Sequence, residues 1–344
     1  MKAVKLIGKR ELKLADVDKP APDGVNVVVR VTNCGICGSD IHFWNLGVGA
    51  GGYQGLILGH ECAGIIEDAG SRNDLKQGDR VTVIPMNPCG ECTTCRKGFV
   101  NLCENAYKRP QPGQNGPGGY AEYISVRPDM VRRLPDTISD LEGAMIEPAT
   151  VGLHAVKEAG IKRGDRVLIV GGGTIGLLCA AWARIQGASF IAITEANAER
   201  ASKAREMGYA DAVFDAADKG LKSSIKKATS GGVDVAIDAS ASDAGINSAL
   251  MVLRPRGTLV LAGISFEPQS LLTLVATMKE VTIRPSYAYL PGDFDSAIDS
   301  MARGILKTER FISRVVGMSE VQETFGILDS RKTGDVKIVI GITK

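Results

Sequence analysis

Residues 166–178 read Arg-Val-Leu-Ile-Val-Gly-Gly-Gly-Thr-Ile-Gly-Leu-Leu, an apolar β-type run that enters a cluster of glycines and leaves it as a helical pattern. The spacing G-x-G-x-x-G is weak alone, but between a strand and a helix it is typical of a dinucleotide site. The first glycine permits a tight turn, the second lets the backbone approach a pyrophosphate, and the third lets helix and strand pack closely. The pyrophosphate then meets the free N–H groups at the helix N-terminus. The expected binding positions are Gly171, Gly173, Thr174, Ile175 and Gly176.

The next predicted strand ends at Glu195, 19 residues after Gly176. A carboxylate there accepts hydrogen bonds from the adenosine ribose hydroxyls and repels a 2′-phosphate, which favours NAD over NADP as cofactor. Arg200, inside the following predicted helix, could instead serve a 2′-phosphate. The competing interpretations are a solvent-exposed acid for Glu195 and an adenosine site of the methyltransferase type for the glycine turn.

Strands and helices alternate around this motif from about residue 141 onward. Strands are expected at 166–170, 190–194, 212–214, 233–238 and 258–261, and helices at 150–159, 174–186, 198–207, 221–229 and 243–253. Strict alternation with apolar, β-branched strands is typical of a doubly wound parallel sheet. The fold class expected for this part is therefore α/β, of the Rossmann type.

The first part of the chain has a different pattern, and its 344 residues, 44% of them hydrophobic, suffice for two domains. Short β-type runs at 25–31, 63–66, 80–84 and 120–126 alternate with Gly and Asp turns, which predicts a β-barrel or sandwich. The Gly-rich stretch 47–55 reads as a mobile loop. A last segment is too short to be a domain, so we expect it to pack on another part; its expected elements are helices near 294–303 and 321–330 and a strand at 336–340.

Four cysteines have the spacing of a single tetrahedral zinc site in one loop: Cys89, Cys92, Cys95 and Cys103. Four sulfur ligands leave no open position for water, so this zinc is expected to be structural. Disulfides are the first alternative, but they require an oxidising compartment, and residues 1–10 lack the apolar core of a secretory signal. We therefore expect a cytoplasmic protein.

A nucleic-acid-binding zinc module is the second alternative for the four cysteines. It would need more positive charge than the net +2 of this chain, whose only basic residues near the cluster are Arg96 and Lys97. No apolar run approaches the roughly 18 residues of a membrane span. Neither a nucleic acid nor a membrane is expected as a partner.

A second, open metal site can be assembled from Cys37, His60 and Glu61, with Glu147 as a fourth candidate. Catalytic zinc needs three protein ligands and one exchangeable position, and sulfur, imidazole and carboxylate are suitable donors. His60 is one of 3 histidines and stands directly before a predicted strand, whereas Cys37 lies in an expected turn at 34–42. Taken singly, Cys37 and His60 could each be structural. The remaining cysteines are expected to be small core residues: Cys34, Cys62 and Cys179.

The chain resembles the medium-chain, zinc-dependent alcohol and polyol dehydrogenases, most of all the group of sorbitol/xylitol, 2,3-butanediol and threonine dehydrogenases. The similarity covers essentially the whole chain. Besides the glycine turn and the four cysteines, it rests on Cys-Gly-Ile-Cys-Gly-Ser-Asp-Ile-His at 34–42, Gly-His-Glu at 59–61, Gly-Gly-Tyr-Ala-Glu-Tyr at 118–123 and Glu-Pro-Ala-Thr-Val-Gly-Leu-His-Ala at 147–155.

The resemblance implies a GroES-like β-barrel catalytic domain at 1–149, a Rossmann NAD-binding domain at 150–285, and a segment 286–344 that returns to the catalytic domain. Glu147 points away from the simple alcohol dehydrogenases, which have a cysteine there. The chain departs from the sorbitol enzymes at 106–116 and in its Gly-rich loop at 47–53, so the resemblance leaves the substrate open.

The resemblance also implies a mechanism in which zinc polarises a substrate hydroxyl and the nicotinamide accepts a hydride. Ser39 would take the hydroxyl proton, His42 would export it by way of the cofactor ribose, and Asp40 would orient His60. Alternatively, Ser39 and Asp40 are turn residues and His42 faces solvent. An apolar wall of the pocket is expected from Phe43, Trp44, Leu46, Tyr287 and Tyr289, with positions in the core as the alternative.

The function expected from these features is a zinc- and NAD-dependent dehydrogenase of a secondary alcohol in a polyol, diol or hydroxy-amino acid, with an alcohol or ketone as its small-molecule partner. Lys108 and Arg109 motivate one alternative, a sugar-phosphate polyol dehydrogenase. A non-catalytic NAD-binding redox sensor is the other, although such a sensor would not need Ser39 and His42. The resemblance implies a homodimer or homotetramer.

Overall fold

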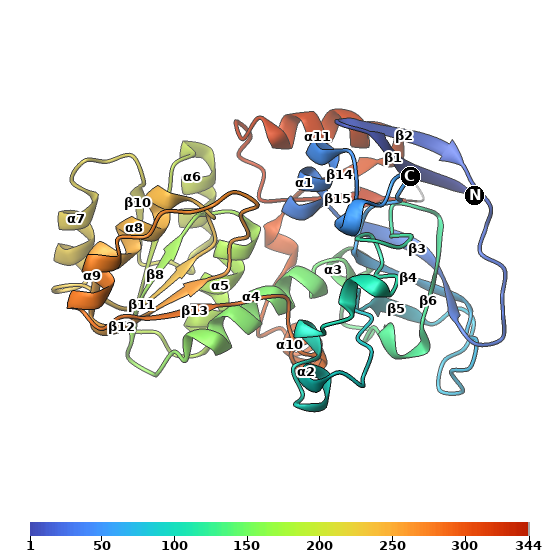
Figure 1. Cartoon of the computed structure of the whole chain (residues 1–344), viewed down its shortest axis with the longest axis horizontal. Helices are drawn as coiled ribbons and strands as arrows, with labels where there is room; N and C mark the ends of the chain where they lie inside the picture. Colours follow the sequence, from blue (N-terminus) through green and yellow to red (C-terminus); the bar gives the residue numbers. More distant parts are fainter. Residues whose placement is uncertain (343–344) are drawn as a thin grey trace. The chain divides into compact units, whose positions relative to one another are not determined.

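The computed structural model describes residues 1–342 and divides into two compact units. The first unit comprises Met1–Glu147 and the chain from Leu290 onward, and the second comprises Pro148–Tyr289. The C-terminal segment is thus part of the same unit as the N-terminal half (Figure 1). No helix within residues 1–342 is long and apolar enough to cross a membrane.

The second unit is built on a six-stranded sheet with the order β10-β9-β8-β11-β12-β13, in which all neighbouring strands run parallel. The strand order reverses on either side of β8, which confirms the predicted doubly wound sheet. The strands are β8 (Arg166–Val170), β9 (Phe190–Glu195), β10 (Ala212–Asp215), β11 (Val233–Asp238), β12 (Leu253–Leu261) and β13 (Thr282–Pro285). The helices are α4 (Ile146–Ala159, which starts in the first unit), α5 (Thr174–Ile185), α6 (Ala198–Met207), α7 (Leu221–Ala228), α8 (Asp243–Val252) and α9 (Thr273–Met278).

The first unit contains a seven-stranded sheet with the order β14-β15-β3-β4-β5-β7, in which β6 also pairs with β3, and a separate hairpin β1-β2. The C-terminal strand β15 pairs with β3, which places Ile340 opposite Cys34. The strands are β1 (Lys2–Gly8), β2 (Glu11–Asp16), β3 (Val27–Gly35), β4 (Glu61–Asp68), β5 (Arg80–Val83), β6 (Tyr123–Val126), β7 (Val131–Arg133), β14 (Ile312–Gly317) and β15 (Lys337–Gly341).

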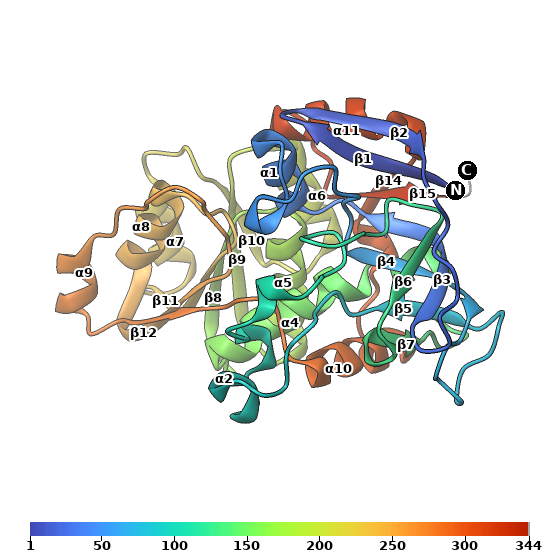
Figure 2. The same ribbon diagram turned by 45° about the vertical axis from the view of Figure 1, so that its right-hand side comes forward.

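Helices and 3₁₀ turns cover and connect these strands. Figures 1 and 2 show α11 lying along β2, where the backbone N–H of Leu12 donates to Gln322 Oε1 at 2.7 Å. The helices are α1 (Gly38–Leu46), α2 (Thr93–Arg96), α3 (Asp140–Gly143), α10 (Pro291–Ala302) and α11 (Val321–Asp329). The 3₁₀ turns are η1 (Ala50–Gly52), η2 (Val100–Leu102), η3 (Ala106–Lys108), η4 (Pro128–Met130), η5 (Glu309–Phe311) and η6 (Met318–Glu320).

The prediction of a turn at 34–42 was wrong, because this stretch ends β3 and begins helix α1. Cys37 is the residue before the first turn of α1, and the Asp40 carboxylate accepts its backbone N–H at 2.9 Å. Gly47 ends the helix with φ of 80°, a left-handed conformation that favours glycine. The helix was missed because its residues lack the apolar spacing on which the other helix predictions depend.

The side chains expected at an apolar pocket wall differ in their burial. Phe43 and Trp44 belong to the core of the first unit, where the Trp44 ring packs edge-on against Phe325 with centroids 5.9 Å apart. Leu46 is exposed, as is Tyr287, whereas Tyr289 is buried. The prediction of core positions for three cysteines is confirmed, since all three are fully buried thiols: Cys34, Cys62 and Cys179.

Candidate functional site

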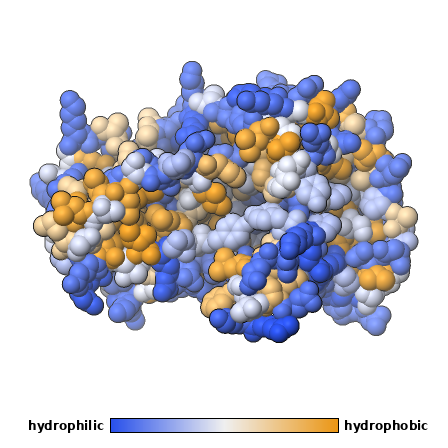
Figure 3. Space-filling model, in the orientation of Figure 1, coloured by the Kyte–Doolittle hydropathy of each residue, from blue (hydrophilic) through white to orange (hydrophobic). Residues whose placement is uncertain are grey.

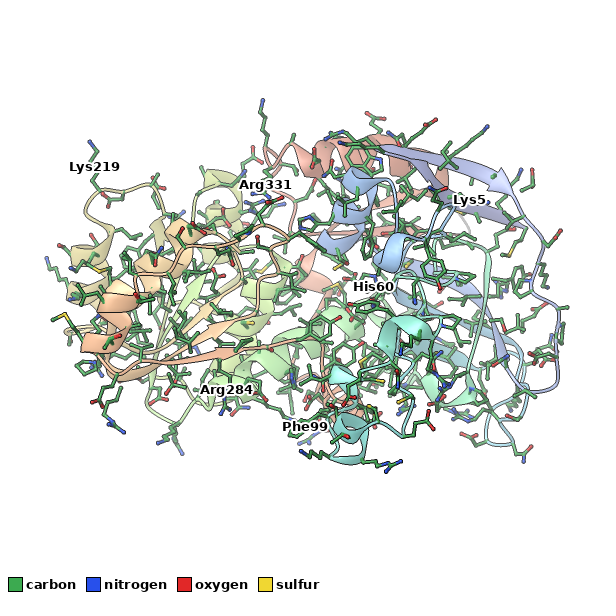
Figure 4. All side chains as sticks on the ribbon, viewed as in Figure 1. Lys5, His60, Phe99, Lys219, Arg284 and Arg331 are labelled. Atoms are coloured by element: carbon green, nitrogen blue, oxygen red, sulfur yellow. The ribbon has the colours of Figure 1, made fainter. Side chains whose placement is uncertain are left out.

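Three candidate metal ligands, Cys37, His60 and Glu61, come together in the first unit, with one ligand atom of each within 4.8 Å of the others. Strand pairing produces this convergence, because Gly35 at the end of β3 lies opposite Glu61 at the start of β4. His60 directly precedes β4, and Cys37 follows β3 by two residues. His60, labelled in Figure 4, and Glu61 are both buried. One sulfur, one imidazole and one carboxylate fit a zinc ion with an open fourth position.

Asp40 faces the imidazole of this cluster. Its carboxylate is 0% exposed, and Oδ1 faces His60 Nδ1 at 3.6 Å. The other oxygen, Oδ2, accepts the Cys37 N–H at 2.9 Å and the Tyr120 hydroxyl at 2.7 Å. Because Nδ1 faces the carboxylate, Nε2 of His60 is the nitrogen left for a metal. Tyr120 was not assigned a role from sequence, although the Gly-Gly-Tyr motif contains it.

The charges of this pair affect each other's pKa. Burial alone would raise the pKa of Asp40, but the charge of the nearby His60 and the hydrogen bonds from Cys37 and Tyr120 leave it below its usual value. Burial alone would lower the pKa of His60, yet Asp40 and Cys37 raise it well above its usual value. Both shifts follow from opposite charges in a site that water does not reach.

A buried lysine, which sequence reasoning missed, completes the surroundings of Glu61. Lys337 is 2% exposed, and its ammonium forms an ion pair with Glu61 Oε2 and donates to the Ile36 carbonyl at 2.9 Å. Burial alone would lower the pKa of Lys337, but the charges of Glu61, Cys37 and Glu147 raise it. A single lysine inside the otherwise apolar strand at 336–342 is the signal that could have identified it.

Glu147, the fourth candidate ligand, does not belong to the three-residue group whose ligand atoms lie within 4.8 Å of one another. It is buried in the first turn of α4, and its charge affects the pKa values of Lys337 and Cys62. The pKa of Cys62 is raised to about 12, mainly by burial and further by Glu147. Glu147 thus lies in the neighbourhood of the cluster, and its role as a ligand stays a prediction.

Ser39 and His42, the predicted proton carriers, lie three residues apart on α1 and therefore on one face of that helix. Both side chains are half-buried. Burial lowers the pKa of His42, the positive charge of Arg331 lowers it further, and Asp329 opposes the shift. His42 is thus neutral, and able to accept a proton, at lower pH than an ordinary histidine.

The four clustered cysteines form a separate group, with all four sulfurs within 4.8 Å of one another. Cys89 Sγ and Cys103 Sγ are 3.5 Å apart, close to the roughly 3.8 Å expected for two sulfurs bound 2.3 Å from one tetrahedral zinc. Hydrogen bonds from Asn105 and from backbone N–H groups lower the pKa of Cys89 to about 6. Among residues 1–342 all the cysteines are free thiols, and the four clustered sulfurs fit a closed zinc site.

The predicted dinucleotide turn connects β8 to α5 in the second unit. Gly171 has φ of 98°, and its N–H donates to the Thr194 carbonyl at 2.8 Å. A side chain at Gly176 would overlap the Gly171 carbonyl, so helix and strand can approach this closely only with glycine. Helix α5 begins at Thr174 and is followed by Ile175. The turn thus presents a helix N-terminus at the switch point of the sheet, which fits a pyrophosphate.

Glu195 is the last residue of β9 and is 6% exposed, so the alternative of a solvent-exposed acid is wrong. Its carboxylate accepts the backbone N–H groups of Gly172 and Asn197, both at 2.7 Å, and Arg200 Nη2 at 3.0 Å. Burial alone would raise its pKa, but Arg200 and these N–H groups lower it. The arginine considered for a 2′-phosphate is therefore paired with the carboxylate that favours ribose.

The basic pair that motivated a phosphate substrate lies in and beside η3. Lys108 is exposed, and Arg109 Nε donates to Asn87 Oδ1 at 3.1 Å. A cavity of about 240 Å³ opens beside Asn87, and none of the candidate metal ligands lines it. Its lining includes Asn26, Asn87, Pro110, Arg127 and Met130. Arg109 is thus bound to Asn87 within the fold.

Two family models match the chain, the alcohol dehydrogenase GroES-like domain at residues 23–136 and the zinc-binding dehydrogenase at residues 174–303. Among curated proteins, probable D-xylulose reductase A of Aspergillus clavatus is 35% identical over 320 residues, covering 90% of this chain and 88% of the relative. A putative zinc-binding dehydrogenase of Sinorhizobium meliloti, solved with NADP, has a TM-score of 0.90 at 30% identity, over 99% of both chains. The 2R,3R-butanediol dehydrogenase of Bacillus subtilis has a TM-score of 0.89 at 28% identity, also over 99% of both.

Proposed function

The chain belongs to the zinc-dependent medium-chain alcohol and polyol dehydrogenases, and on that premise we propose that it oxidises a secondary alcohol of a small polyol or diol with NAD as the hydride acceptor. The convergence of Cys37, His60 and Glu61 carries the proposal, because three mixed donors leave one zinc position for a substrate oxygen. Xylulose and butanediol in the names of two relatives give the substrate class. Membership in an enzyme family removes the alternative of a non-catalytic redox sensor.

Individual residues of the site have separate roles in the proposed reaction. When bound, zinc lowers the pKa of a substrate hydroxyl and the nicotinamide accepts the hydride from the adjacent carbon. We assign Cys37 and His60 as fixed ligands, with Asp40 holding the imidazole. Ser39 takes the hydroxyl proton and His42 carries it outward, so that a ketone remains after the hydride and the proton have left. Glu61 and Glu147 would be the exchangeable carboxylate ligands, in contrast to the fixed Cys37 and His60.

NAD is the favoured form of the cofactor in this proposal, although a similar protein binds NADP. Glu195, at the end of β9, would accept hydrogen bonds from the adenosine ribose hydroxyls. A 2′-phosphate would meet that carboxylate and would have to draw Arg200 out of its ion pair with Glu195. The contacts at the strand tip therefore support NAD.

A homo-oligomer, dimer or tetramer, forms in this proposal through the second unit. Strand β13 is at the edge of the sheet, and the segment before it exposes large apolar side chains. Figure 3 shows apolar residues gathered over α9. The exposed residues are Ile264, Phe266, Leu271, Leu272, Leu274 and Met278. Light scattering should show the oligomer in the wild type and a smaller species for Leu274→Glu.

Free thiols throughout residues 1–342 support the cytoplasm as the location.

The experiment that tests the activity is a panel of polyols, diols, amino alcohols and phosphorylated polyols, assayed by NADH absorbance with the purified zinc enzyme. Turnover of a polyol or diol, faster with NAD than with NADP, is expected. Turnover restricted to primary alcohols, or to phosphorylated substrates, would contradict the proposal.

A further inference from the structure

Lys337 is a charged side chain in a place where apolar residues would be expected. It is 2% exposed at the start of β15, and every residue of this strand is buried. A buried ammonium is costly unless charged and hydrogen-bonding partners compensate for the lost water. Among residues 1–342, Lys337 finds such partners in the metal cluster of the first unit.

Both partners of the ammonium belong to that cluster or adjoin it. Nζ forms an ion pair with Glu61 Oε2, and it donates to the carbonyl of Ile36, the residue before Cys37. Glu61 is 1% exposed, so water does not screen the pair. The same carboxylate is one of the three candidate ligands.

The fold keeps space for this ion pair. Gly35 lies opposite Glu61 in the β3–β4 pairing and opposite Val339 in the β15–β3 pairing. A side chain at Gly35 would overlap Glu61 Oε2 and would approach Lys337 Cε to 2.8 Å. Since the backbone of Gly35 is not left-handed, space is the reason for a glycine there. Three neighbouring strands, β4, β3 and β15, thus build one site for the lysine and the glutamate.

We propose that Lys337 is a positioning residue that competes with zinc for the Glu61 carboxylate and so makes Glu61 a labile ligand. This inference rests on the proposed function, because it requires a catalytic zinc between Cys37 and His60. A carboxylate shared with an ammonium binds a metal more weakly than a free one, since each cation reduces the charge available to the other. Lys337 thus keeps one coordination position available for the substrate oxygen.

The direction of the effect separates this role from a structural one. Without the ammonium, Glu61 is a buried carboxylate whose only strong cationic partner in the cluster is zinc, so zinc should leave more slowly. If Lys337 merely supported the fold, its loss would loosen the site and zinc would leave faster.

The test compares Lys337→Met, Lys337→Arg and wild-type holoenzyme by the rate at which zinc passes to a colorimetric chelator, without alcohol or nucleotide. Lys337→Met should slow release from the faster of the two sites about ten-fold, the effect of one charged contact. Turnover should fall in Lys337→Met, and Lys337→Arg should restore the wild-type rates of zinc release and of turnover. Lys279→Met is the matched control, because Lys279 is an ammonium bound to three carbonyls in the second unit. Its zinc release should equal that of the wild type.

The variants Glu61→Gln and Glu61→Gln/Lys337→Met keep the test decisive if the single Lys337→Met protein fails to fold. With no carboxylate to compete for, the lysine should make no difference, so the two proteins should release zinc at the same rate. Faster or unchanged release from Lys337→Met, or unequal rates in this second pair, would overturn the inference. Since no substrate is present, a failed polyol panel would reject the proposed function without altering this comparison.

Discussion

Asp40 Oδ1 lies 3.6 Å from His60 Nδ1 inside the first unit, and Asp40 is 0% exposed. The carboxylate is itself held by the Cys37 N–H and the Tyr120 hydroxyl, so one acid connects both fixed donors of the candidate zinc site. The rotation of the imidazole and the position of the cysteine are therefore set by the same buried group.

The first prediction concerns this acid. Asp40→Asn keeps the shape but removes the charge that orients His60, and it should weaken binding of the catalytic zinc by about 10- to 100-fold. Tyr120→Phe, which removes only the hydroxyl that supports Asp40, should have a smaller effect in the same direction. Competition with a chelator of known affinity measures both. Equal zinc affinity in Asp40→Asn and wild type would show that Asp40 does not orient His60 for zinc binding.

The second prediction concerns cofactor choice. Glu195→Ala leaves the N–H groups of Gly172 and Asn197 without their acceptor and releases Arg200. NAD binding should weaken by about 1–3 kcal/mol, the cost of leaving a polar partner unpaired. The preference over NADP should shrink, because the repelling charge is gone and a free arginine remains. Dissociation constants for both cofactors measure this, with the exposed Glu199→Ala as control. Unchanged constants would show that Glu195 does not contact the ribose.

The third prediction concerns the two metal sites, which should differ in exchange. Four sulfur ligands would form a closed shell around one zinc, whereas Cys37, His60 and Glu61 would leave one position of the other zinc open. A mild chelator should therefore abolish activity before it lowers the melting temperature. Parallel assays of turnover and thermal unfolding follow the two losses. If turnover and melting temperature fell together, a single kind of zinc site, or a single zinc ion, would account for both activity and stability.

The fourth prediction concerns pH. Because burial and then Arg331 lower the pKa of His42, the acidic limb of turnover should lie below the value of about 6.5 of an ordinary histidine. Only neutral His42 accepts a proton, so turnover is lost as pH falls through this pKa. Arg331→Gln removes a positive charge that disfavours the imidazolium, and the limb should move to higher pH. Profiles of kcat between pH 5 and 8 test this, with His42→Gln expected to lack the limb. An identical limb in all three proteins would exclude His42 as the proton carrier.

The features that the sequence predicted well depend on short stretches of chain. The glycine turn and Glu195 lie within one strand–helix–strand segment, and the parallel sheet around them follows from local alternation. The four cysteines occupy one loop, so their spacing alone brings them together. Residue roles at both metal sites stay predictions.

Other features depend on contacts that local patterns do not contain. Lys337 reaches Glu61 only because β15 pairs with β3, and that long-range pairing has no local signal. Trp44 was expected at a pocket wall, but its ring packs on Phe325 of a helix near the other end of the chain. The hairpin β1-β2 was missed because several lysines interrupt its apolar pattern.

The most direct test of the central claim is the zinc content of Cys37→Ala, His60→Ala, Glu61→Gln and Glu147→Gln, measured with turnover and melting temperature. The wild type should hold two zinc ions per subunit. Cys37→Ala and His60→Ala should each hold one, lose turnover and keep the four-cysteine zinc, since no neighbouring group replaces a fixed sulfur or imidazole. The two Gln variants should keep partial occupancy of the catalytic site with slower turnover. Two zinc ions in Cys37→Ala or His60→Ala, or full activity in either Gln variant, would contradict the account.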